Sequence, residues 1–272
     1  MIRPLLGGPY VDLAPFIDLR GLEDIDDEVC AALSELQTDY TGGSHRSMGI
    51  VPPSLLGESW VDYGEVIAKM KREEFARFIG LGDEPIADFD LDGAAGYEFG
   101  EEREHPLSRA QMRYLELKHR VYFPWKHYYE LMPNDRWDDK SDGVGKQFTD
   151  EAKDFFPRTI ALVKRLPFVE IGRCNLLGLA ANDFGTVHRD GDPAEKPGVD
   201  HFITIAPRGD KRLFLWDEER QERHFVHGRA YWFDDSNYHG VAADPFFRYS
   251  IRIDGVFDET FLARLRDTKR AA

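Results

Sequence analysis

The spacing of hydrophobic positions along this chain changes near residue 165. Before that point, apolar residues recur three and four positions apart in several segments, as expected for helices with one buried face. Acidic residues lead the first of these segments, where they suit a helix N-terminus. The predicted helices are Leu22 to Leu36, Trp60 to Leu81, Ser108 to Leu131 and Thr149 to Lys164. The Gly-rich segment from Thr41 to Pro53 lacks helix formers and indicates a strand or an ordered loop.

From Phe168 onward, apolar and polar residues alternate in short runs separated by polar turns, which is the period of β-strands. The predicted strands are Phe168 to Leu179, His201 to Ala206, Arg212 to Trp216, Glu222 to Val226, Arg229 to Phe233 and Phe246 to Phe257. A final helix is expected from Asp258 to Arg270. The segment from 168 to 257 is therefore expected to be almost entirely β-structure.

A run of closely spaced strands behind a helical region predicts an α+β fold with a mainly β core. The expected architecture is a double-stranded β-helix, that is, a cupin-like jelly roll, with an N-terminal helical support layer. No internal repeat or flexible linker divides the chain, so residues 1–272 are expected to form a single catalytic unit. Within it we expect a mostly helical support region (1–165), the jelly-roll core (166–258) and a C-terminal helix (259–272).

Composition excludes several classes of function. The chain of 272 residues has a formal net charge of −15 and a pI near 5.0, so binding to nucleic acid phosphates or anionic membranes is not expected. Its two cysteines, Cys30 and Cys174, lie far apart and suggest neither a disulfide framework nor a thiolate metal site. With no signal-peptide core and no membrane-spanning run, we expect a cytoplasmic protein.

The most informative residues are His188, Asp190 and His239. On a strand, side chains two positions apart face the same way, so His188 and Asp190 can point into a barrel together. His239 follows His188 by 239 − 188 = 51 residues, a span that fits several antiparallel strands returning to one metal. Two imidazoles and one carboxylate form the facial triad of non-haem Fe(II), which leaves positions open for O2. We therefore predict that these three residues are the metal ligands and the catalytic centre.

A cation follows the second histidine on the last predicted strand. Arg248, Ser250 and Arg252 share one face of this strand, and an arginine inside a barrel requires an anion. A planar guanidinium can hold a carboxylate by two charge-assisted hydrogen bonds. Arg248 is therefore expected to bind the distal carboxylate of 2-oxoglutarate, with Ser250 as an additional hydroxyl donor.

The same region resembles a known family. The run Gly228-Arg-Ala-Tyr-Trp-Phe-Asp-Asp-Ser-Asn-Tyr-His239, followed by Arg248, is similar to the aspartyl/asparaginyl β-hydroxylase family of Fe(II)/2-oxoglutarate oxygenases, which includes bacterial free-proline cis-hydroxylases. The resemblance covers roughly residues 177–257. It implies that His188 and His239 bind iron and that Arg248 binds 2-oxoglutarate. Asp190 matches the proline-hydroxylase branch, since the peptidyl-aspartyl branch lacks this carboxylate.

One departure from the family concerns the strand after the first metal ligands. The family usually has Arg-x-His there, whereas this chain has Asp200-His201-Phe202. The family's substrate contact at that position is therefore not carried over to this chain.

These residues lead to a prediction of function. We expect a dioxygenase that uses Fe(II), 2-oxoglutarate and O2 to hydroxylate an unactivated C–H bond of a free amino acid or a small amino-acid-derived molecule. The carboxylate of such a substrate needs a cation and its ammonium group needs an anion. The candidates for these contacts are Arg46, His45, Arg252 and Asp200.

Two alternatives remain open on the sequence. The substrate can be an Asp, an Asn or another residue within a peptide. Alternatively, the chain is a metal-binding cupin that is not an oxygenase, because fold alone does not fix function. Arg248 distinguishes the second alternative, since a cupin that does not use 2-oxoglutarate has no need for a cation at that depth.

Overall fold

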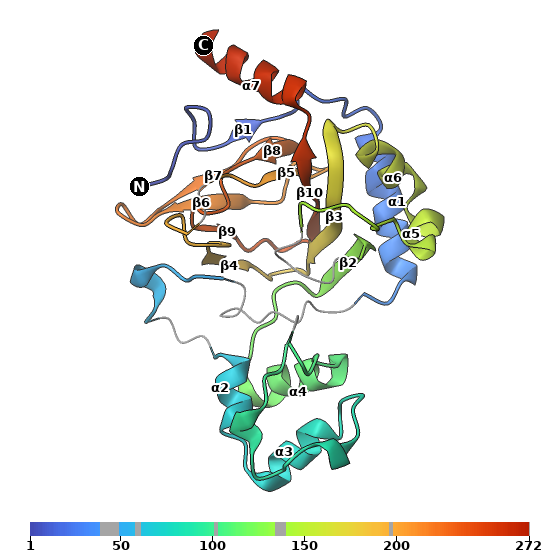
Figure 1. Cartoon of the computed structure of the whole chain (residues 1–272), viewed down its shortest axis with the longest axis vertical. Coiled ribbons are helices and arrows are strands. Elements are labelled where there is room, and N and C mark those ends of the chain that lie inside the picture. Colours follow the sequence, from blue (N-terminus) through green and yellow to red (C-terminus); the bar gives the residue numbers. More distant parts are fainter. Residues whose placement is uncertain (39–48, 58–60, 101–102, 134–139, 196–197, 272) are drawn as a thin grey trace.

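Two antiparallel β-sheets form the centre of the protein, seen here in a computed structural model that describes residues 1–38, 49–57, 61–100, 103–133, 140–195 and 198–271 (Figure 1). The larger sheet has the strand order β1-β8-β5-β10-β3-β2 and the smaller one the order β4-β9-β6-β7. The strands of the larger sheet are β1 (Val11–Asp12), β2 (His127–Met132), β3 (Phe168–Leu179), β5 (His201–Ile205), β8 (Ala230–Trp232) and β10 (Arg248–Phe257). Those of the smaller sheet are β4 (Gly185–His188), β6 (Leu213–Asp217), β7 (Glu222–Phe225) and β9 (His239–Val241).

Strand β10 organises the larger sheet, because it pairs with β3 on one side and β5 on the other. Its side chains alternate between two different environments. Tyr249, Ile251 and Ile253 belong to the main hydrophobic core. The intervening side chains are polar yet equally buried: Arg248, Ser250, Arg252 and Asp254. The inner side of this sheet therefore carries a row of buried polar groups.

Three helices lie beside the larger sheet, next to β3 and β2 in Figure 1: α1 (Leu22–Glu35), α5 (Asp150–Phe155) and α6 (Pro157–Val163). Apolar side chains of α1 and α6, such as Val29 and Leu162, share the core with Ile251. The Tyr249 hydroxyl also donates a hydrogen bond to Asp26 Oδ1 of α1 at 3.0 Å. These helices form the support layer expected from the sequence.

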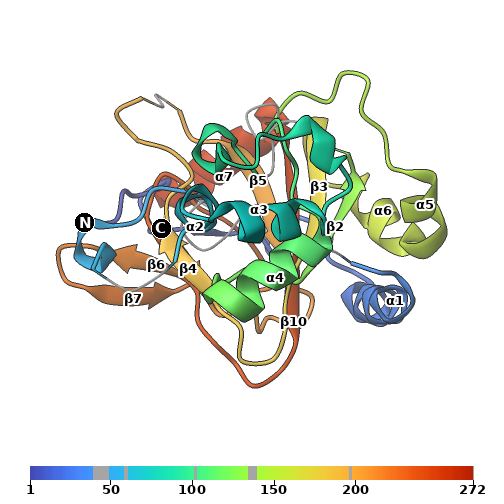
Figure 2. The same cartoon turned by 90° about the horizontal axis from the view of Figure 1, so that it is seen from below.

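Three other helices gather around a second, separate core (Figures 1 and 2). They are α2 (Tyr63–Ala68), α3 (Arg72–Ile79) and α4 (Arg109–His119), joined by the 3-10 turns η2 (Ile86–Asp88) and η3 (Ala94–Gly96); a further 3-10 turn, η1 (Pro53–Leu55), precedes them. Aromatic rings fill this core, with Phe75 packed against both Phe89 and Phe99. The helices before residue 165 are thus divided into two groups, where the sequence suggested one layer.

Three predicted helices are interrupted. The segment up to Leu81 forms α2 and α3, with a break around Met70 and Lys71. The segment from Ser108 begins as predicted, because Ser108 and Gln111 form a capping box. It ends at His119, where Arg120 adopts a left-handed conformation with φ 61°.

The second half of that predicted helix is a strand. Residues 127–132 form β2, which pairs with β3. The helical reading of the aromatic residues here was wrong, because an open edge of β3 offers backbone hydrogen bonds that a local pattern does not reveal. The helix predicted from Thr149 to Lys164 is also broken, at Phe156 before Pro157, into α5 and α6.

The two other predicted helices and all six predicted strands are confirmed. Helix α1, strands β3, β5, β6, β7, β8 and β10, and helix α7 (Glu259–Ala271) agree with it to within two residues at each end. The mainly β, antiparallel core is confirmed as well. The short strands β1, β4 and β9 were not predicted. No helix in the described ranges has the length and apolar character needed to cross a membrane.

Candidate metal centre

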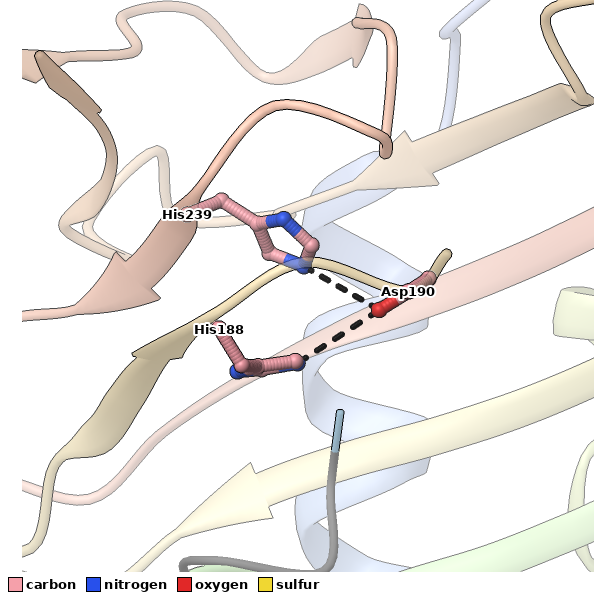
Figure 3. Close-up of side chains that lie close together, drawn as sticks. All are labelled: His188, Asp190 and His239. Carbon is pink, nitrogen blue, oxygen red and sulfur yellow. Dashed lines mark ion pairs between the residues drawn. The ribbon is translucent and has the colours of Figure 1, made fainter. Parts of the chain in front are cut away.

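The three predicted metal ligands come together between the two sheets (Figure 3). His188 is the last residue of β4 and His239 the first residue of β9, and the two are directly opposite each other in the antiparallel pair. Asp190 follows β4 by two residues and turns back toward both rings. One potential ligand atom from each side chain lies within 4.8 Å of the others, and among the described residues no other group of three His, Cys, Asp or Glu does so.

The two imidazoles present equivalent atoms to the carboxylate. Asp190 Oδ1 lies 3.5 Å from His188 Nε2 and 3.5 Å from His239 Nε2. The ring centroids are 4.6 Å apart, with an interplanar angle of 53°. Two nitrogens and one oxygen therefore surround a common point.

Each imidazole is oriented by a backbone carbonyl two residues earlier in the chain. His188 Nδ1 lies 2.8 Å from the Thr186 carbonyl oxygen, and His239 Nδ1 lies 2.9 Å from that of Asn237. A carbonyl can only accept, so both Nδ1 atoms carry the proton and both Nε2 lone pairs remain available. A hydrogen bond of this kind commonly fixes the tautomer of a metal-binding histidine.

The protonation states suit a metal. Burial lowers the pKa of His239 to about 4, although Asp190 acts in the opposite direction. Burial alone would raise the pKa of Asp190, but the two neighbouring histidines and the positive charges of Arg252 and Lys140 hold it well below its usual range. At neutral pH the site thus offers a neutral imidazole at His239 and an ionised carboxylate at Asp190.

Arg252 lies behind the carboxylate of Asp190. Its Nη1 is 3.5 Å from Asp190 Oδ2, whereas the two histidines lie near the other carboxylate oxygen, Oδ1. Its other donors contact Asp235 Oδ2 at 2.9 Å and Asp254 Oδ1 at 3.0 Å, and the guanidinium stacks over the Phe202 ring. The structure therefore places this predicted substrate residue against a predicted metal ligand.

Asp200, another predicted substrate residue, lies in the same ionic network. Lys140 Nζ is 2.5 Å from Asp200 Oδ2 and 3.0 Å from Asp235 Oδ2. The backbone of Asp235 also accepts a hydrogen bond from the Asp190 amide at 3.1 Å. Burial, followed by the charge of Asp190, raises the pKa of Asp235. The sequence gave no reason to include Lys140, because it lies in a polar loop 48 residues before His188 (188 − 140).

Arg248 occupies the opposite end of the same face of β10. Its Nη1 donates to the carbonyls of Asp244 and Phe246, and its Nη2 donates to those of Asp183 and Ala242. Its Nε has no hydrogen-bond partner within the described part of the chain, and the same is true of Ser250 Oγ two residues later. Both atoms are buried, so the structure leaves two polar groups unsatisfied at this point.

Two further unsatisfied atoms lie across the inner face. Asn175 Oδ1 and Tyr231 OH are buried without a hydrogen-bond partner in the ranges that the structure describes. Asn175 is opposite Arg252 on β3, and Tyr231 is opposite Thr204, which itself pairs with Arg252. Because buried polar atoms are almost always satisfied in folded proteins, a cluster of exceptions marks a place for a polar ligand or for water.

His45 and Arg46, the remaining predicted substrate residues, lie outside the described residues. The chain next to them runs along the metal centre. Ile50 and Arg189 exchange two backbone hydrogen bonds of 3.0 Å each. Within the described residues of this segment, an isolated β-bridge at Ile50 lies beside the first predicted metal ligand, while residues 41–48 of the expected strand or loop lie outside the described residues.

The chain near residue 3 holds the loop that leads to His239. The Arg3 amide donates to Asn237 Oδ1 at 2.7 Å, and Asn237 Nδ2 donates back to the Arg3 carbonyl at 3.1 Å. The Arg3 guanidinium also donates to Ser236 Oγ at 2.8 Å. This contact across 234 residues has no signal in the sequence.

Comparisons with known proteins give only distant structural likenesses. No family model matches the chain, and no curated protein matches it significantly. Among solved structures, it is similar to an oxidoreductase of the 2OG-Fe(II) oxygenase family from Burkholderia pseudomallei, with a TM-score of 0.31 and 14% identity. That match covers 47% of this chain and 66% of the other.

Two prolyl hydroxylases are similar to a lesser degree. One, from Trichoplax adhaerens in complex with a hypoxia-inducible factor peptide fragment, has a TM-score of 0.27 and 17% identity, over 42% of this chain and 60% of that one. The other, a Pseudomonas putida prolyl-4-hydroxylase, has a TM-score of 0.25 and 10% identity, over 40% and 68% of the two chains. The chain thus covers less than two thirds of the first two proteins. At these values, the functional argument rests on this chain's own residues.

Proposed function

We propose that this protein is an Fe(II)/2-oxoglutarate-dependent dioxygenase that hydroxylates an unactivated C–H bond of a free amino acid or a small amino-acid-derived molecule. The observation that carries the proposal is the convergence of His188, Asp190 and His239 on one point, with both Nε2 atoms facing it. We further propose that the two sheets form a double-stranded β-helix of the proline cis-hydroxylase-like branch.

The donor set fits Fe(II). Two borderline imidazole nitrogens and one hard carboxylate oxygen are the ligands of non-haem iron oxygenases, and three protein ligands leave positions open for other molecules. Zinc in a structural site would more often have four protein ligands. The described residues supply no fourth His, Cys, Asp or Glu to this group.

The unsatisfied atoms on β10 fit 2-oxoglutarate. Arg248 Nε is a buried cationic donor, and Ser250 Oγ is a buried hydroxyl on the same face. A carboxylate placed between them would accept a hydrogen bond from each. This supports the assignment of Arg248 and Ser250 to the distal carboxylate of the cosubstrate.

When bound, Fe(II), 2-oxoglutarate and O2 supply the oxidation, in which the substrate C–H becomes C–OH and the oxo acid becomes succinate and CO2. The protein's own residues prepare the site for this chemistry. The carbonyls of Thr186 and Asn237 hold the two imidazoles in the tautomer that presents Nε2. Arg252 compensates the charge of Asp190 and fixes its outer oxygen. Burial of both histidines limits access of water.

The charges beside the triad suit a substrate that is itself a zwitterion. Arg252 and Lys140 alternate with Asp235 and Asp200 within hydrogen-bonding distance of one another. An amino acid can exchange its carboxylate and ammonium groups into such a network without leaving a charge uncompensated. We therefore assign Arg252 and Asp200 to the substrate side of the site, and His45 and Arg46 stay candidates from the sequence.

The test requires no knowledge of the substrate. Fe(II) and then 2-oxoglutarate are added to the metal-free protein under anaerobic conditions while visible absorbance is recorded. We expect a charge-transfer band that is lost in His188→Ala and weakened in Arg248→Ala. A panel of free amino acids and short peptides is then assayed for succinate formation.

A band followed by succinate formation with a free amino acid would support the proposal in full. Turnover of peptides but not of free amino acids would show that the substrate is a residue within a peptide. A folded, iron-loaded protein with no band would overturn the oxygenase assignment in favour of a cupin that uses its metal otherwise.

A further inference from the structure

A second cation lies buried at the end of the site where Arg248 is found. Lys211 precedes β6 and is only 3% exposed. Its Nζ donates a hydrogen bond to the carbonyl of Leu177 on β3, and Leu177 is directly opposite Ser250 on β10. The side chain of Lys211 thus extends from the start of β6 in the smaller sheet to the larger sheet, where its ammonium group lies beside the residue that pairs with Ser250.

Lys211 has no direct counterion among the described residues. Besides the Leu177 carbonyl, its Nζ contacts the face of the Trp125 ring, 4.7 Å from the centroid. No carboxylate oxygen of the described residues lies within the 4.0 Å of an ion pair with it. Burial, followed by the positive charge of Arg248, holds the pKa of Lys211 well below its usual range, and Asp210 only partly opposes this.

Arg248 also lacks a carboxylate partner among the described residues. Among the described residues its guanidinium donates to backbone carbonyls alone, and Asp244, the acidic group that most raises its pKa, forms its own ion pair with Arg212 at 2.9 Å. Asp183 contributes its carbonyl to Arg248, while its carboxylate faces Lys126 at 3.8 Å. Two buried cations therefore lie close together, and no carboxylate in the part of the chain that the structure describes contacts either of them.

The hydrogen bonds of Arg248 limit what it can do alone. Four backbone carbonyls occupy its two terminal nitrogens, so only Nε–H remains to meet a ligand. A two-point grip on a carboxylate by the end of this side chain, as expected from the sequence, would require breaking these bonds. Lys211 supplies the missing donor without that cost, because an ammonium group has three protons and only one of them is used in a hydrogen bond within the described residues.

We propose that Lys211 binds the distal carboxylate of 2-oxoglutarate, together with Arg248 Nε–H and Ser250 Oγ–H. The inference rests on the proposed function and adds to it the residue that selects a dicarboxylic oxo acid. A buried ammonium group is costly without an anion. A monocarboxylic oxo acid would leave both cations uncompensated, so Lys211 acts as a specificity-determining residue.

The test compares two ligands that differ only at this carboxylate. 2-Oxoglutarate and 2-oxopentanoate have the same chain length, but the second ends in a methyl group. Their dissociation constants are measured anaerobically on the iron-loaded wild type and on Lys211→Met by titrating the charge-transfer band. Lys164→Met, which removes an exposed lysine that contacts the Phe148 ring, is the matched control.

We expect Lys211→Met to lower the affinity for 2-oxoglutarate by at least about 30-fold, because removing one partner of a buried charge pair has an effect of this size. The affinity of Lys211→Met for 2-oxopentanoate should remain within about twofold of wild type. Lys164→Met should bind both ligands within about twofold of wild type. Lys211→Arg should retain part of the preference for 2-oxoglutarate. Equal losses for both ligands, or no loss for 2-oxoglutarate, would overturn the role of Lys211.

Failure of the wider proposal gives a different result. If wild-type protein with iron bound shows no 2-oxoglutarate band, the dioxygenase assignment itself is wrong. If Lys211→Met does not fold, Lys211→Gln, which keeps a hydrogen-bond donor for the Leu177 carbonyl but no charge, takes its place. The same pair of ligands then decides the question.

Discussion

Gly49 lies directly against the imidazole of His188. A Cβ atom at position 49 would be 3.0 Å from His188 Cδ2 and would overlap the Arg189 carbonyl oxygen. The backbone around residue 49 is therefore part of the wall of the metal centre, and only glycine allows it to come so close.

The substitution Gly49→Ala should displace either this segment or the His188 ring. We expect affinity for Fe(II) to fall by about tenfold or more, since the orientation of a ligand sets metal affinity as its supporting contacts do. Anaerobic titration calorimetry with Fe(II) measures the change. Gly57→Ala is the control, because a Cβ there meets no atom within 4 Å. Equal affinity in the two variants would contradict the close packing at residue 49.

Arg252 is the common partner of three carboxylates, those of Asp190, Asp235 and Asp254. Its replacement by methionine should leave them buried without their shared cation. The expected loss in the free energy of unfolding is about 3–5 kcal/mol. Urea denaturation of the metal-free protein measures it.

An exposed arginine provides the comparison. Arg20 pairs with Asp18 at 2.6 Å, but its side chain is 90% exposed. Arg20→Met should change the free energy of unfolding far less than Arg252→Met, because exposed ion pairs contribute little to stability. Similar losses for the two variants would show that burial does not govern the strength of the Arg252 network.

Asn237 links the chain near residue 3 to the second histidine. Its side chain exchanges two hydrogen bonds with the backbone of Arg3, and its own carbonyl accepts from His239 Nδ1. Asn237→Ala should loosen this loop and reduce Fe(II) affinity by about tenfold, as loss of an outer support commonly does. Asn237→Asp keeps the acceptor for the Arg3 amide and should give an intermediate value. Unchanged affinity in Asn237→Ala, measured by the same calorimetry, would assign the loop's position to other contacts.

His201 makes stability depend on pH. Burial lowers its pKa, with Asp200 acting in the opposite direction. Its Nδ1 accepts a hydrogen bond from the Phe257 amide at 3.1 Å, and its ring stacks on that of Phe257. The unfolded chain binds the proton more tightly, so the contribution of His201 is complete above its ordinary pKa, about 6.5, and decreases as the pH falls below it.

The measurement is urea denaturation at about pH 7.5 and about pH 5.5, on either side of that pKa. His201→Gln has an acceptor for the Phe257 amide but does not titrate. It should lose less stability than wild type between the two pH values. An equal loss would mean that other groups carry the pH dependence.

The strands and the metal centre were open to prediction from sequence for physical reasons. Alternation along β10 separated Tyr249, Ile251 and Ile253 from the polar residues, and the structure keeps this division. The spacing of His188 and Asp190, with His239 far along the chain, predicted a shared site because few arrangements bring two imidazoles and a carboxylate together.

What escaped prediction depends on contacts between distant segments. The aromatic run in β2 has helical spacing, but pairing with β3 decides its conformation. Lys140 and Lys211 read as ordinary surface lysines, and only their burial against residues of other elements distinguishes them. The short strands β4 and β9, with four and three residues, carry too little pattern to be recognised.

Those same short strands give a metal a role in folding. Four strands, β5 to β8, lie between His188 and His239 in the sequence. An ion bound to both would act as a reversible cross-link that closes a loop of 239 − 188 = 51 residues. A link of this kind restricts the unfolded chain in proportion to the logarithm of loop length, as a disulfide does. Cys30 and Cys174 are both free, so a metal bound to the two histidines would be a removable cross-link, and its loss would loosen the strands that lie between them.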